Sequence, residues 1–95
     1  MALSIHQRES LIMALQFPNP SRSYDAGRQC VSFWGYDNSR EITFVVDDAM
    51  LKNLQPGVGN DERSILGAFD EFREKLLEIA KKLYVGGPQI RYSIS

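Results

Sequence analysis

The amino-acid sequence predicts an α+β protein, an antiparallel β-sheet with one long amphipathic helix packed on one face. Two neighbouring segments, residues 29–36 and 40–47, alternate between apolar and polar side chains as strands do, and residues 61–85 repeat with the period of a helix. The first strand segments stand together before the helical ones, an order that favours a sheet with helices on one side over an alternating α/β fold.

Length and composition restrict the class of protein. A chain of 95 residues forms one domain around one core, and 43% hydrophobic with 24% charged residues is typical of a folded globular protein. The formal net charge of −1 gives no general attraction to a phosphate backbone, so nucleic acid is disfavoured as a partner. No apolar run reaches the roughly 18 residues of a membrane span, and we expect a cytoplasmic protein without a membrane partner.

Residues 1–12 are interpreted as a poorly ordered N-terminal extension ahead of a single domain at residues 13–95. The tripeptide Met-Ala-Leu at the start of the chain recurs directly before the first strand, which makes Met13 a candidate second start. Charged side chains in the extension interrupt the continuous apolar core that a secretory signal needs.

The first part of the predicted domain is a β-meander. Residues 14–17 predict a brief strand that ends at Pro18, because proline has no N–H group for a β-ladder. Residues 29–36 and 40–47 then predict a β-hairpin, joined by a turn of Asp, Asn and Ser.

Two helices and a last strand are expected to follow. Asp47 or Asp48 is expected to cap a short helix that ends at Leu54, and Asn60 or Asp61 to cap the long one. The long helix places its apolar side chains four and three residues apart, at Ile65, Phe69, Phe72, Leu76, Ile79 and Leu83. Gly-Gly-Pro at residues 86–88 ends this helix, and residues 89–95 predict the final strand.

The predicted strands sort their side chains onto two faces of the sheet. We expect the helix-facing set to be Val31, Phe33, Ile42, Phe44, Val46, Ile90, Tyr92 and Ile94, and the other set to be Cys30, Ser32, Trp34, Tyr36, Thr43, Val45, Arg91 and Ser93. A contiguous face of the second kind suits self-association or a protein partner. The alternative is that residues 1–12 or the short helix cover it.

Several runs of this sequence resemble one family. FPNPSRSYD, VSFWGYD, EITFVVD, and AFDEFREK followed by KLYVGG are similar to the domain-of-unknown-function family 1488 of small bacterial proteins. The resemblance covers residues 13–95. It implies a compact α+β domain in which a β-meander packs on helices, and it carries no catalytic residue, cofactor or ligand that could be transferred to this chain.

The segment at residues 17–37 holds the candidate interaction surface, which consists of Arg22, Tyr24, Asp25, Arg28, Trp34 and Tyr36. Arginine forks suit carboxylate or phosphate groups, and tryptophan and tyrosine give rigid contact area. The alternative interpretation is structural. In it, Tyr24 and Trp34 cover the edge of the sheet, while Asp25 and Arg28 act as local caps or ion partners.

The functional hypothesis is a small, non-enzymatic interaction module that binds an unknown protein partner or itself, with a homodimer as one form. One histidine, His6, and one cysteine, Cys30, leave no recognisable catalytic, metal or cofactor site, and Cys30 is expected to be a small buried hydrophobe. The alternative is a small-ligand or anion binder that uses Arg22, Arg28, Tyr24 and Trp34. Single-stranded nucleic acid binding is a third hypothesis, which the net charge opposes.

Overall fold

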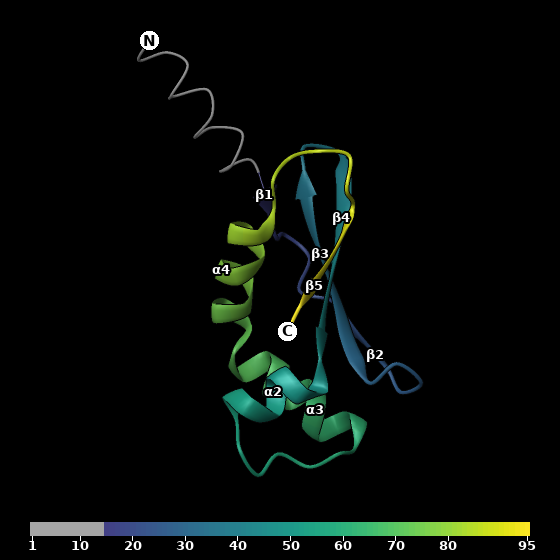
Figure 1. Ribbon diagram of the computed structural model, residues 1–95, viewed down its shortest axis with the longest axis vertical. Helices are drawn as coiled ribbons and strands as arrows, with labels where there is room; N and C mark the ends of the chain where they lie inside the picture. The colour runs from purple at the N-terminus through teal and green to yellow at the C-terminus, as the bar shows by residue number, and fades with distance from the viewer. Residues whose placement is uncertain (1–14) are drawn as a thin grey trace.

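A computed structural model describes residues 15–95 and shows a sheet with all its helices on one side (Figure 1). The elements in chain order are β1 (Leu15–Gln16), β2 (Arg22–Asp25), β3 (Cys30–Asp37), β4 (Arg40–Asp47), α2 (Asp48–Leu54), α3 (Glu62–Glu71), α4 (Arg73–Leu83) and β5 (Arg91–Ile94). The α+β class is as predicted. The predicted extension at residues 1–12 and the candidate start at Met13 lie outside the described residues.

The sheet is mixed, and this corrects the predicted antiparallel sheet. β1 and β2 both pair antiparallel with one edge of β3, and the other edge of β3 pairs antiparallel with β4. β5 pairs with β4 in parallel. The connections explain the difference: a short turn reverses the chain, whereas the helices between β4 and β5 return it to the same end of the sheet.

β2 is a strand that the sequence did not predict. Its residues Arg22 to Asp25 are a mixture of charged, small and aromatic side chains and show no apolar alternation. It is a strand because β3 offers a free edge: Arg22 pairs with Phe33 and Tyr24 with Val31. This pairing also decides which way its side chains point.

Strand register confirms most of the predicted helix-facing set. Phe33 lies opposite Phe44, which lies opposite Tyr92, so these side chains share one face across three strands. The buried members of the set are Val31, Phe33, Ile42, Phe44, Val46, Tyr92 and Ile94. Ile90 was predicted among them and is wrong: it precedes β5 and is 55% exposed.

The predicted long helix is wrong in its continuity, because it bends at Phe72 into α3 and α4. Phe72 has φ −105° and ψ 16°, well away from helical values, and the two helices run in different directions (Figure 1). After the bend, the side of the helix that meets the sheet differs from the side predicted by the apolar repeat. α4 buries Leu76 and Ala80, with Tyr84 directly after it, whereas Leu83 is 38% exposed.

The predicted helix ends are largely correct. The Asp47 side chain accepts a hydrogen bond from the Met50 N–H at 2.8 Å at the start of α2, and Asp61 accepts one from the Ser64 N–H at 3.1 Å at the start of α3. After α4, Gly86 adopts a φ of 76°, the left-handed conformation expected where the chain leaves the helix.

An aromatic cluster fills the space between the sheet and the helices. Phe44 has ring neighbours in Phe17, Phe33 and Tyr92, with centroids 5.5 to 5.7 Å away. Phe17 reaches this cluster from the loop after β1 because Gly35 has no side chain there. A Cβ atom at Gly35 would lie 2.8 Å from the Phe17 ring. The loop that carries Pro18 and Asn19 is therefore anchored by packing.

Candidate functional site

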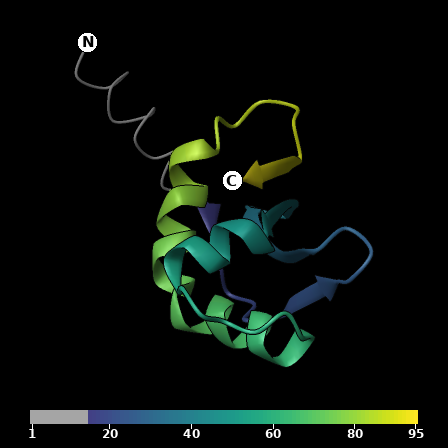
Figure 2. The same cartoon turned by 60° about the horizontal axis from the view of Figure 1, so that its bottom comes forward.

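The candidate site is the face of the sheet opposite the helices, called here the open face. Figure 2 shows the teal and green helices together on one side of the strands, and no element of residues 15–95 lies over the other side. Register places four rows of side chains there: Gln16, Tyr36 and Glu41; Trp34, Thr43 and Arg91; Ser23, Ser32, Val45 and Ser93; and Asp25, Cys30 and Asp47.

The six residues of the predicted interaction surface do not form one patch. Arg22 and Tyr24 pair with helix-facing residues of β3 and therefore point toward the helices. Trp34, Tyr36 and Asp25 lie on the open face, and Arg28 lies in the turn between β2 and β3. The division follows from β2, because neighbouring residues of a strand point to opposite faces.

Arg22 is engaged within the protein. Its Nε and Nη2 donate to Oδ1 and Oδ2 of Asp70 in α3 at 2.9 and 2.8 Å, a two-point contact between a guanidinium and a carboxylate. The hydrogen bonds to Asp70 raise the pKa of Arg22. The donors of Arg22 face the helices, so the predicted anion site built on Arg22 and Tyr24 is not assembled.

The carboxylates of the open face also have partners. The Tyr36 hydroxyl donates to Glu41 at 2.8 Å, and this bond raises the pKa of Tyr36. Asp25 accepts a hydrogen bond from the Arg28 N–H at 3.0 Å and shapes the turn. Asp47 caps α2. The three acids therefore serve local structure.

Apolar and aromatic side chains fill the middle of the open face. Trp34 and Tyr36 are half-buried, and Val45 and Cys30 are buried although no described helix lies over them. The Cys30 thiol is free and buried, which suits a small hydrophobe in a strand.

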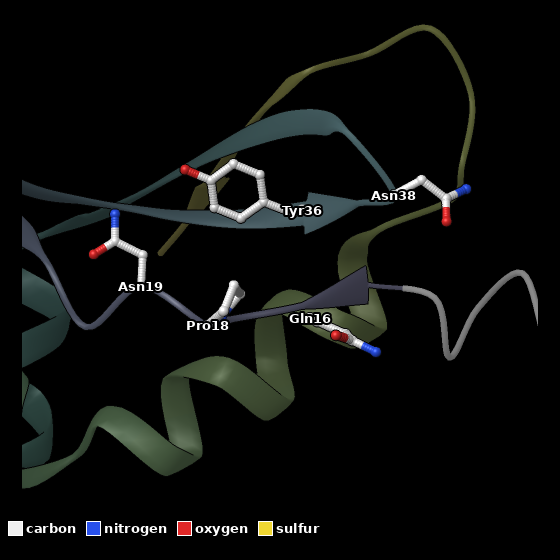
Figure 3. Close-up of a pocket in the computed structure, with 5 residues that line it drawn as sticks. All are labelled: Gln16, Pro18, Asn19, Tyr36 and Asn38. Atoms are coloured by element: carbon white, nitrogen blue, oxygen red, sulfur yellow. The ribbon is translucent and has the colours of Figure 1, made fainter.

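A hollow of about 460 Å³ lies at the β1 edge of the open face (Figure 3). Its lining residues are Gln16, Pro18, Asn19, Tyr36 and Asn38. Figure 3 shows the Tyr36 ring standing over β3, with the Asn19 amide on the facing loop. The lining has no charged side chain, so its chemistry is that of neutral amide and phenol groups beside an aromatic ring.

Sequence reasoning did not identify Gln16, Asn19 and Asn38 as site residues. Gln16 and Asn38 were predicted only as parts of a strand and a turn, and the anchoring of Phe17 over Gly35 that brings the loop of Asn19 to β3 has no signature in the sequence. The alternation of β3 did place Tyr36 on the correct face.

Metal-binding clusters and membrane-spanning helices are both absent from residues 15–95. Residues 15–95 contain no group of three or more histidine, cysteine, aspartate or glutamate side chains that could hold a metal ion. Within the same residues, none of the helices has the length and apolar composition needed to cross a membrane.

Fold and site together define a small α+β domain in which helices cover one sheet face and no element of residues 15–95 lies over the other. The chain belongs to the family described as "Protein of unknown function (DUF1488)", which matches residues 15–95 and confirms the resemblance predicted from the sequence. A protein of unknown function from the same family, from Shewanella loihica PV-4, has a similar crystal structure.

That structure has a TM-score of 0.69 and 16% sequence identity, and the match covers 85% of this chain and 91% of the other. At this identity the likeness shows the fold alone. A search of curated proteins gave no match.

Proposed function

We propose that this protein is a small non-enzymatic interaction module that associates with a second copy of itself through the open face. The observation that carries the proposal is the position of Trp34, a half-buried side chain in the middle of a sheet face over which no element of residues 15–95 lies. Tryptophan and tyrosine are the side chains that contribute most to binding energy at protein interfaces.

The charges of the open face support a partner with the same face. Asp25, Glu41 and Asp47 lie on it together with Arg91, and Arg28 borders it. A two-fold dimer places one patch against an identical one, so such a patch must carry its own complementary groups. A face with both signs of charge meets this requirement.

The size of the face supports a weak and reversible contact. Strands spaced by about 4.8 Å and rising about 3.3 Å per residue give the strand residues of this face a projected area of roughly 400 Å². A stable interface usually buries about 800 Å² on each partner. We therefore expect a dimer that forms with increasing protein concentration.

Light scattering across micromolar to millimolar concentrations tests the proposal. The wild-type chain is expected to move from monomer to dimer mass, and Trp34→Ala to remain monomeric over the same range. Tyr24→Ala is the matched control, because Tyr24 is also a half-buried aromatic residue but faces the helices. A monomer at every concentration, or a dimer that survives Trp34→Ala, contradicts the proposal.

A further inference from the structure

A second hollow lies at the β5 side of the open face and brings together two arginines that are far apart in the sequence. It has a volume of about 310 Å³, and its lining includes Arg28, Cys30, Val45, Asp47, Arg91 and Ser93. Arg28 belongs to the turn before β3, and Arg91 begins β5. The two arginines lie toward opposite ends of the hollow, because Arg91 lies opposite Thr43 of β4, whereas Arg28 comes two residues before Cys30, which lies opposite Asp47.

The hollow has an apolar floor and a polar rim. Val45 is 7% exposed and Cys30 is 9% exposed, although neither lies under a described helix. Arg28, Arg91 and Ser93 are exposed around them. Arginine stems can lie along apolar surface while their charged ends remain in water, and both Arg28 and Arg91 line the hollow.

Among residues 15–95, the guanidinium groups of Arg28 and Arg91 have few carboxylate partners, so their N–H donors are available to a ligand. Among residues 15–95, no carboxylate lies within ion-pair distance of Arg91, and the ion pair of Arg28 is a long one, with its Nε 4.0 Å from Asp25 Oδ2. One oxygen of Asp47 accepts the Met50 N–H. The lining holds two arginines and one aspartate, and the carboxylate of Ser95, the last residue of the sequence, also borders it, so anion binding depends on the available guanidinium donors and not on a net positive charge.

We infer that this hollow binds a monocarboxylate with a short apolar body. A carboxylate accepts parallel hydrogen bonds from a guanidinium group, and the body of such a molecule can lie on Val45 and Cys30. Asp47 disfavours a doubly charged anion such as phosphate. The volume is at the lower end of the roughly 300–1,000 Å³ of ligand pockets, which limits the ligand to a small molecule.

This inference does not use Trp34, which does not line the hollow, but Arg28 and Arg91 also belong to the proposed dimer face, so the ligand and a second copy would compete for the same surface. It also differs from the anion site predicted from the sequence, which used Arg22, Arg28, Tyr24 and Trp34. Of those four residues only Arg28 remains, and Arg91 takes the place of Arg22.

The test is an NMR titration of the ¹⁵N-labelled chain with hexanoate, acetate and inorganic phosphate, at an ionic strength held constant with sodium chloride. Hexanoate is expected to shift the amide signals of Cys30, Val45 and Ser93 in a saturable way, and acetate to do so more weakly because it lacks the apolar body. Absence of a saturable shift with hexanoate, or tighter binding of phosphate than of hexanoate, overturns the inference.

Three arginine variants locate the binding. Arg91→Gln and Arg28→Gln are each expected to weaken hexanoate binding about tenfold, the effect of losing a hydrogen bond to a charged group. Arg63→Gln is the control, since Arg63 is an exposed arginine at the start of α3 and does not line the hollow. The same spectra report whether each variant is folded. Unchanged affinity in both Arg91→Gln and Arg28→Gln contradicts the assignment.

Discussion

The two faces of the sheet are built from the same strands, and they differ in what determines their side chains. Val45 and Val46 are neighbours in β4: Val46 lies in the core under the helices, and Val45 lies on the open face between Ser32 and Ser93. On the covered face, interlocking aromatic rings leave little choice of residue. On the open face, Trp34 and Arg91 lie where no described helix packs on them.

Because only one face packs against the helices, substitutions on the two faces should affect different properties of the protein. A substitution on the covered face is expected to change the free energy of unfolding, and one on the open face to change association or ligand binding.

The largest effect is expected for Phe44→Ala. Phe44 is fully buried and touches three other rings, so its removal leaves a cavity and should cost about 3–5 kcal/mol of stability. Its neighbour Thr43 faces the other side, and Thr43→Ala should cost less than about 1 kcal/mol. Urea unfolding measures both. Similar losses of stability in the two variants would contradict the claim that the covered face contributes more to stability than the open face.

Gly35→Ala should have the next largest effect. The new Cβ atom would meet the Phe17 ring at 2.8 Å and Leu15 Cδ1 at 3.1 Å, and such overpacking costs about 1–3 kcal/mol. Because the clash is with Phe17, adding Phe17→Ala should remove most of the extra penalty. A double-mutant cycle by urea unfolding measures this coupling. Strict additivity of the two substitutions would show that Phe17 does not pack over Gly35.

Tyr84 closes the covered face at the end of α4 and gives it a dependence on alkaline pH. Its hydroxyl donates to Asp37, and burial together with this bond raises the pKa of Tyr84 to about 12. A pKa above the unfolded value of about 10 favours the protonated form in the folded state, so this stabilisation is complete below about pH 10 and is lost between about pH 10 and 12.

The advantage of the wild-type chain over Tyr84→Phe should therefore shrink by about 1–2 kcal/mol across that range. Urea unfolding of both chains at several alkaline pH values measures the change. If the difference in unfolding free energy between the two chains stays constant over this pH range, the Tyr84 hydroxyl does not provide this stabilisation.

Asp61 lies away from both faces and should give the smallest effect, at acid pH. Hydrogen bonds from Ser64 lower the pKa of Asp61, so its contribution is present above the unfolded value of about 3.9 and is lost as the pH falls through the lower folded value. Asp61→Asn keeps a good helix cap but removes the titration. The melting temperatures of the two chains should converge as the pH falls below the unfolded value and through the lowered pKa of Asp61. If the difference in melting temperature between the two chains does not change with pH, the ionised Asp61 side chain does not stabilise the start of α3.

The sequence predicted those parts of the fold that have a local pattern. β3 and β4 alternate over eight residues each, and the aspartate caps of α2 and α3 stand directly before the helices that they begin. The direction of β5 has no local pattern, because alternation is the same for a parallel and an antiparallel strand. The bend at Phe72 was also hidden, since Phe72 continues the apolar repeat and neither proline nor glycine stands at the bend.

The candidate site was predictable only where strand alternation alone decided it. Trp34 and Tyr36 were placed on the open face because β3 was recognised. Arg22 was misplaced because its side depends on pairing between β2 and β3, and its partner Asp70 is 48 residues away. The hollow between Arg28 and Arg91 depends in the same way on contacts between distant segments.

Side-chain NMR signals recorded at increasing protein concentration test most directly whether binding belongs to the uncovered side of the sheet. The account predicts that the Trp34 indole N–H and the Val45 methyl signals move as the protein is concentrated, while the Val46 methyl signals stay fixed. Signals that are all independent of concentration, or Val46 signals that move as far as those of Val45, would contradict it.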